Sequence, residues 1–176
     1  AGVLSGTREA QAAYEILGVY GRALSARFAP KAPAGALPVE NRGVAWKTER
    51  SGKSVGAQAW EDTAEGAASD VATHRREVPA LLYENPNPAG KNFVRFDAVD
   101  PADPFTIVDR KRGATTKSEQ VEKFRNVIQA LEQNKEYRLR IEVPTKKAAG
   151  DARRLIRYAA NAPSHPQIFV EIVRAP

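Results

Sequence analysis

Apolar residues recur three or four positions apart in four segments of the chain, which is the spacing of one face of a helix. These segments are residues 7–28, 54–73, 116–134 and 145–161. The most regular stripe lies in the third segment and consists of Val121, Phe124, Ile128 and Leu131. Thr116 and Glu119 have the spacing of a capping box at its start, and Ser54 is a candidate N-cap for the second segment.

Five shorter runs are continuously apolar or alternate between apolar and polar residues, as strands do. They are residues 80–83, 92–99, 105–110, 137–143 and 167–173. From residue 54 onward, the predicted order is one helix, three consecutive strands, and then helix, strand, helix and strand. This order predicts an antiparallel meander followed by two β-α-β crossovers. We therefore expect an α/β (α+β) fold with a mixed central β-sheet flanked by helices on both faces.

The first helix is separated from the rest of the chain by residues 29–43, which are rich in Pro, Ala and Gly. That composition is typical of a linker or an extended arm. We expect an N-terminal helix and Pro/Ala-rich arm over residues 1–43 and a compact domain over residues 44–176. Because the chain starts at Ala1 and has no Met, we expect it to be processed or excised from a longer polypeptide.

Composition excludes several kinds of site. Without Cys the chain has no disulfide, no thiolate nucleophile and no Cys-ligated zinc. Its two histidines, His74 and His165, are isolated, which disfavours a nuclease with a His-ligated metal. No apolar run is long enough to span a bilayer, so no membrane partner is expected.

The net charge of +6 is unevenly distributed. Residues 110–157 carry 14 Lys/Arg and 6 Asp/Glu, a net of +8, which leaves −2 for the remainder. A basic half beside an acidic half indicates a face that binds a polyanion. A solvated surface with no ligand is an equally good interpretation of charge alone.

Three residues near the ends of two predicted strands have the chemistry of a hydrolytic site. Asp97 ends one strand, and Asp109 and Lys111 end the next. Side chains two apart on a strand share a face, so Asp109 and Lys111 should lie together while Arg110 points away. If the two strands pair, Asp97 lies beside Asp109. A strand end that enters solvent would be the simpler interpretation of the same residues.

Phosphodiester cleavage needs such a set. Two carboxylates, from Asp97 and Asp109, can hold Mg²⁺ (or Mn²⁺), and the backbone carbonyl of Arg110 is a further candidate metal ligand. The cation neutralises charge on the phosphate and lowers the pKa of a water. The Lys111 ammonium can orient that water and stabilise the transition state.

These residues lie in a longer pattern. It comprises Phe96-Asp97, Ile107-Val108-Asp109-Arg110-Lys111, a Thr-Thr-Lys sequence opening a helix, and Ile141-Glu142-Val143-Pro144. The pattern resembles the restriction-endonuclease-fold, or PD-(D/E)xK, toxin domains at the C-termini of polymorphic, type VI-secreted and contact-dependent bacterial toxins. The resemblance covers roughly residues 59–173.

The resemblance implies a restriction-endonuclease-like core and nuclease activity. It also implies delivery on a larger N-terminal polypeptide, secretion from the producing bacterium, action in the cytoplasm of the target cell and a cognate immunity protein. The family usually adds a helix carboxylate to the catalytic residues, and Glu61, after Trp60, matches that position. Glu65 lies one helical turn later and is the alternative.

Other residues are candidates for supporting roles. Glu142 could lie behind the site, although an ion pair with Arg138 or Arg140 on its own strand is slightly favoured. Gln120 could approach phosphate or base edges, or simply face solvent. The candidate nucleic-acid contacts are basic residues of the positive half, namely Arg110, Arg112, Lys117, Lys123, Arg153 and Arg154.

The leading hypothesis is a Mg²⁺-dependent DNase toxin inhibited by an acidic immunity protein, since the inhibitor must cover a basic cleft. An RNase toxin on the same fold, for example one that cleaves tRNA, is the first alternative, because a metal–phosphate site can act on either backbone. A non-catalytic module that binds nucleic acid or protein is the second alternative.

Overall fold

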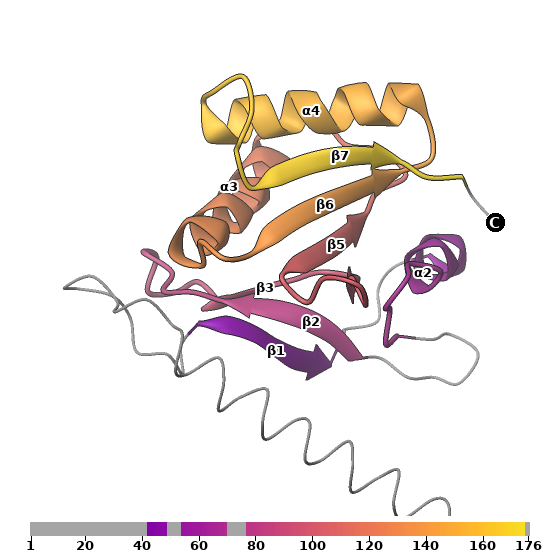
Figure 1. Cartoon of the computed structure of the whole chain (residues 1–176). Coiled ribbons are helices and arrows are strands. Elements are labelled where there is room, and N and C mark those ends of the chain that lie inside the picture. The colour runs from indigo at the N-terminus through magenta and orange to yellow at the C-terminus, as the bar shows by residue number, and fades with distance from the viewer. Residues whose placement is uncertain (1–41, 49–53, 70–76, 175–176) are drawn as a thin grey trace, which may run out of the picture. The chain divides into compact units, whose positions relative to one another are not determined.

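The computed structural model describes residues 42–48, 54–69 and 77–174, which form three helices and two β-sheets (Figure 1). The helix predicted over residues 7–28 lies outside the described residues, as does most of the arm. None of the described helices has the length and apolar character of a membrane span. The elements in chain order are β1 (Gly43–Thr48), α2 (Val55–Asp62), β2 (Glu77–Leu82), β3 (Phe93–Arg95), β4 (Ala98–Val99), β5 (Thr106–Arg110), α3 (Ser118–Gln133), β6 (Arg138–Val143), α4 (Lys146–Ala160) and β7 (Ile168–Ile172).

Two sheets replace the single central sheet expected from the sequence. β1, β2 and β3 form an antiparallel sheet with β2 in the centre. The second sheet has the order β4-β5-β6-β7, in which β4 is antiparallel to β5 while β5, β6 and β7 are parallel. α3 and α4 connect the parallel strands, so the predicted β-α-β crossovers and the mixed character of the sheet are confirmed. The prediction of one sheet is wrong.

The division between the sheets falls inside the strand predicted over residues 92–99. The amide of Phe96 donates to the carbonyl of Pro79 in β2, and the amide of Asp97 donates to the carbonyl of Val108 in β5, both at 2.9 Å. The chain thus changes its pairing partner between two consecutive residues. Phe96 remains only 2% exposed, so burial continues through the break and the hydrophobic pattern carries no sign of it.

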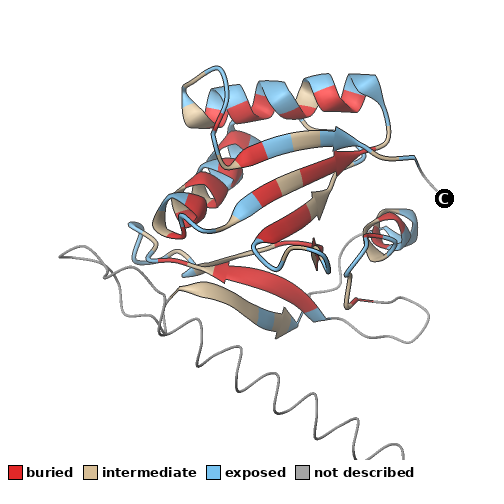
Figure 2. Ribbon diagram, in the orientation of Figure 1, coloured by how far each residue is buried: buried red, intermediate tan, exposed pale blue. Residues whose placement is uncertain are grey.

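The main hydrophobic core lies between the four-stranded sheet and the helices α3 and α4, whose inward faces are buried (Figure 2). β5 and β6 contribute Ile107, Leu139 and Ile141 to it. On the opposite face of the sheet, Val108 packs against Ala64, just after α2. Phe169 of β7 points to that opposite face by strand alternation and is 42% exposed, so the described helices cover this face mainly at its β5 side.

α2 is much shorter than the helix predicted over residues 54–73. The predicted N-cap is confirmed, because the Ser54 hydroxyl accepts a hydrogen bond from the Ala57 amide at 3.3 Å. The helix ends at Asp62, and residues 63–69 continue as turns and extended chain. The strand predicted over residues 80–83 begins earlier, at Glu77, so Pro79 lies inside β2.

The remaining helices follow the predictions closely, except at one cap. α3 begins at Ser118 and its N-cap residue, Lys117, makes no side-chain capping bond, so the predicted capping box is wrong. Glu119 pairs instead with Lys123 at 2.6 Å. In α4 the Thr145 hydroxyl accepts from the Ala148 amide at 3.1 Å.

Asn134, at the end of α3, joins that helix to the three-stranded sheet. Its side-chain oxygen accepts from the Gly43 amide of β1 at 2.8 Å. Its side-chain nitrogen donates to the carbonyls of Leu82 in β2 and Ala130 in α3, at 2.8 and 2.7 Å. Because Asn134 is fully buried, these bonds satisfy a polar group that would otherwise be costly to enclose.

Gly66 is required where the chain leaves α2 and crosses β4. Its φ is +81°, and a Cβ added there would lie 1.9 Å from the backbone oxygen of Val99. We predict that Gly66→Ala lowers the free energy of unfolding by about 2 kcal/mol or more, measured by urea denaturation. Gly150→Ala is the matched control, because Gly150 lies within α4 with open space around it, and should raise stability by up to about 1 kcal/mol. Equal stability of Gly66→Ala and the unaltered chain would contradict this account.

Candidate active site

Asp109 and Lys111 lie on the same side of β5, as strand alternation predicts. The Lys111 ammonium is 2.7 Å from Asp109 Oδ2, and the two side chains are 29% and 15% exposed. The backbone of Lys111 extends the β5–β6 pairing by one residue, since its amide donates to the Glu142 carbonyl at 2.9 Å. The end of β5 therefore holds this ion pair in place while leaving it partly accessible to solvent.

Asp97 lies at the junction between β3 and β4 rather than at the end of a strand. Its Oδ2 accepts a hydrogen bond from the backbone amide of Arg110 at 2.7 Å, and the residue is 8% exposed. That bond orients the carboxylate at the end of β5, next to the Asp109–Arg110–Lys111 triplet. The two strands do pair, as β4 and β5, and the change of sheet at Asp97 brings its carboxylate to the end of β5.

Three carboxylates act electrostatically on Lys111. Burial by itself lowers the pKa of Lys111, but the carboxylates of Asp109, Asp97 and Glu61 together outweigh burial and raise it above its ordinary value. Lys111 is therefore a cation at neutral pH. Glu61, from the last turn of α2, is close enough to act electrostatically on the same ammonium as the two aspartates.

The structure separates the two candidate helix carboxylates. Glu61 lies within α2, but Glu65 lies beyond the end of the helix at Asp62 and is exposed. The expectation that Glu65 shares a helical face with Glu61 is therefore wrong. Hydrophobic periodicity continues past Asp62, whereas the turn at Gly66 depends on its contact with Val99, a residue distant in sequence.

The oxygens of Asp97 and Asp109 have the chemistry that Mg²⁺ prefers. Within the described residues there is no group of three or more His, Cys, Asp or Glu arranged to hold a metal ion. Mg²⁺ is commonly bound through one or two carboxylates, with waters and substrate phosphate completing its coordination. The two aspartates therefore fit a Mg²⁺ site that is completed by water and substrate phosphate better than a site in which the protein supplies every ligand.

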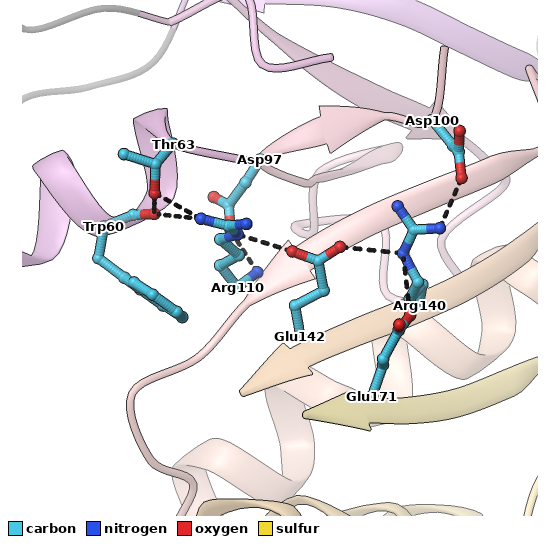
Figure 3. A network of polar contacts seen from close by, with 8 residues as sticks. All are labelled: Trp60, Thr63, Asp97, Asp100, Arg110, Arg140, Glu142 and Glu171. Atoms are coloured by element: carbon cyan, nitrogen blue, oxygen red, sulfur yellow. Dashed lines mark hydrogen bonds and ion pairs between the residues drawn. The ribbon is translucent and has the colours of Figure 1, made fainter. Parts of the chain in front are cut away.

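Arg110 points away from Asp109 and Lys111, and its environment differs from the one we expected for a nucleic-acid contact. Its Nε donates to Glu142 Oε2 at 2.7 Å, and its Nη1 donates to the Trp60 carbonyl at 3.2 Å (Figure 3). The side chain is 9% exposed, so the guanidinium has little surface left for a phosphate. Strand parity could have indicated this, because Arg110 shares a face with the fully buried Val108.

Glu142 lies between two arginines. Besides Arg110, it binds Arg140, whose Nε is 3.0 Å from Glu142 Oε1. The ion pair with a residue of its own strand is thus found for Arg140, whereas Arg138 is exposed. Glu142 is 4% exposed and pairs in register with Arg110, so it lies on the face opposite Asp109 and cannot support that carboxylate directly.

Arg140 extends the network toward the far side of the sheet. It forms ion pairs with Asp100, beyond β4, at 2.5 Å and with Glu171 of β7 at 3.7 Å (Figure 3). We call the set Arg110, Glu142, Arg140, Asp100 and Glu171 the inner ion-pair network. Its charges alternate, so each buried guanidinium is neutralised by at least one carboxylate.

The remaining candidate contacts lie on the surface. Those that the structure leaves exposed are Arg112, Lys117, Gln120, Lys123, Arg153 and Arg154. Two of them are already in ion pairs, Lys123 with Glu119 and Arg154 with Asp151 at 3.8 Å. Exposed pairs of this kind are weak and would not prevent an exchange for phosphate.

Comparison with known proteins finds no matching family model, no matching curated protein and no matching solved structure.

The inner ion-pair network predicts a specific acid sensitivity. The Ala102 amide, followed by Arg140, lowers the pKa of Asp100 below its ordinary value despite partial burial. A lowered carboxylate pKa adds stability above the unfolded-state value, and this stability is lost as the pH falls through the folded-state value. We expect urea midpoints of the unaltered chain to fall below about pH 4 more steeply than those of Asp100→Asn. Parallel pH profiles would show that Asp100 does not contribute in this way.

Proposed function

We infer that the chain is a Mg²⁺-dependent nuclease of the PD-(D/E)xK type. The observation that carries this inference is the placement of Lys111 against Asp109, with Asp97 fixed beside them by the Arg110 amide. The antiparallel β4–β5 pair followed by the β5-α3-β6 crossover supports a restriction-endonuclease-like core. The β4–β5 pairing brings Asp97 to the end of the four-stranded sheet where Asp109 and Lys111 lie.

The residues of the chain divide the chemistry among them. Asp97 and Asp109 would hold the divalent cation, which supplies charge neutralisation at the phosphate when bound. Lys111 stays protonated, so its ammonium can orient the attacking water and stabilise negative charge that develops on the phosphate oxygens. Glu61 adds a third carboxylate that acts on the same lysine.

DNA is the proposed substrate, with RNA as the alternative that the test must separate. The exposed basic residues of α3 and α4 support binding to a phosphate backbone, since such contacts are independent of sequence. An acidic immunity protein, delivery by a larger secreted polypeptide and action in the cytoplasm of a target cell complete the proposal. These last features depend on the resemblance to toxin domains.

Asp109→Asn and Lys111→Ala test the proposal directly. We predict that each lowers cleavage of supercoiled plasmid by about 100-fold or more while the protein stays folded, because each removes a group that acts on the transferring phosphate. Cleavage should require Mg²⁺ and stop in EDTA. Parallel reactions with total RNA decide between DNA and RNA as the substrate, and circular dichroism checks folding.

Glu136→Gln and Lys135→Ala are matched controls. They remove the same charges from exposed residues that precede β6, at the end of the sheet away from Lys111. Both should cleave at the rate of the unaltered chain. Full activity in Asp109→Asn or Lys111→Ala would show that the site is assigned wrongly, and binding without cleavage would favour a non-catalytic module.

A further inference from the structure

α2 is too short to be stable through its own hydrogen bonds. It has eight residues, and no basic residue in its last turn offsets the partial negative charge of its C-terminal carbonyls. A helix of this length therefore depends on contacts with the rest of the fold. Trp60, which is 5% exposed, is one such contact.

Arg110 of β5 supplies the missing cation at this end of the helix. Its Nη1 donates to the carbonyl of Trp60 at 3.2 Å and to the Thr63 hydroxyl. Its guanidinium carbon also lies 4.7 Å from the centroid of the Trp60 ring. One side chain thus binds the helix through its backbone, its C-cap residue and its buried aromatic ring (Figure 3).

The guanidinium is held in this orientation from behind. Glu142 binds its Nε at 2.7 Å, and the two side chains are only 9% and 5% exposed. Arg140 binds the other oxygen of Glu142 at 3.0 Å and so limits its rotation. The end of α2 is therefore attached to a rigid ion pair that spans β5 and β6.

Glu61 lies between the two residues that Arg110 contacts, Trp60 and Thr63. We propose that Arg110 is a positioning residue, which docks the end of α2 and thereby keeps Glu61 within electrostatic reach of Lys111. This proposal rests on the proposed function only for its catalytic consequence. Strand alternation in β5 allows both roles, because Asp109 and Lys111 lie on one face and Arg110 lies on the other.

The docking is tested first without any activity assay. In a Trp46→Phe background, which removes the half-exposed tryptophan of β1, Trp60 is the remaining tryptophan. We expect Arg110→Met to shift Trp60 emission to the red and to accelerate amide exchange over residues 55–62 by about tenfold or more. Arg110→Lys should recover less than half of the emission shift and of the exchange difference, because lysine lacks the planar guanidinium of arginine. Arg138→Met, an exposed arginine at the other end of β6, is the control and should change neither readout.

The catalytic consequence is tested by a double-mutant cycle. We expect Arg110→Met to lower kcat for plasmid cleavage by about 100-fold with little change in KM, because it displaces a group rather than removing a substrate contact. In a Glu61→Gln background the same substitution should cost less than about threefold. If Arg110→Met proves unfolded, Thr63→Val replaces it, because that change removes a helix contact and leaves the Arg110–Glu142 pair intact.

The possible outcomes are distinct. Unchanged Trp60 emission and unchanged exchange of α2 in a folded Arg110→Met or Thr63→Val protein would overturn the docking role. Losses of activity that simply multiply in the double variant would overturn the link to Glu61. An unaltered chain that cleaves neither DNA nor RNA would refute the proposed function and the link to catalysis with it, while fluorescence and exchange still decide whether Arg110 docks α2.

Discussion

The buried carboxylate of Glu142, shared by Arg110 and Arg140, is the interaction on which the arrangement of the site depends. Enclosing one charge in a protein interior costs several kcal/mol unless opposite charges and hydrogen bonds compensate it. Here the compensation comes from both neighbouring arginines, and the outer one is neutralised in turn by Asp100 and Glu171. Each member therefore depends on the position of the next. The network ties α2, β5, β6, β7 and the turn after β4 into one arrangement.

β5 carries two functions on its two faces. Asp109 and Lys111 form the partly exposed ion pair of the candidate active site, while Arg110 between them is buried against Trp60 and Glu142. The backbone amide of Arg110 serves the active-site side as well, because it binds Asp97. The triplet Asp109-Arg110-Lys111 thus contains both the candidate catalytic side chains and the side chain that binds the end of α2.

The transition between the two sheets has a similar double effect. Phe96 is hydrogen-bonded to β2, whereas the next residue, Asp97, is hydrogen-bonded to β5 and belongs to the candidate active site. A regular strand through this point would have kept Asp97 in the three-stranded sheet. The irregularity therefore brings the carboxylate to the end of β5, whereas Asn134 joins the three-stranded sheet to α3.

Local sequence determined most elements of this protein, since helical and strand periodicities and the Ser54 cap depend on residues close together in the chain. The order of those elements predicted the two crossovers, because parallel strands need such a connection. It also determined that Asp109 and Lys111 share a face, because strand alternation has a fixed period. Tertiary structure alone decided where α2 ends, how the strand over residues 92–99 divides and which groups surround Arg110. Those features depend on partners distant in sequence, such as Val99 facing Gly66 and Glu142 facing Arg110. Hydrophobic periodicity records that a residue is buried, but it does not record which element buries it.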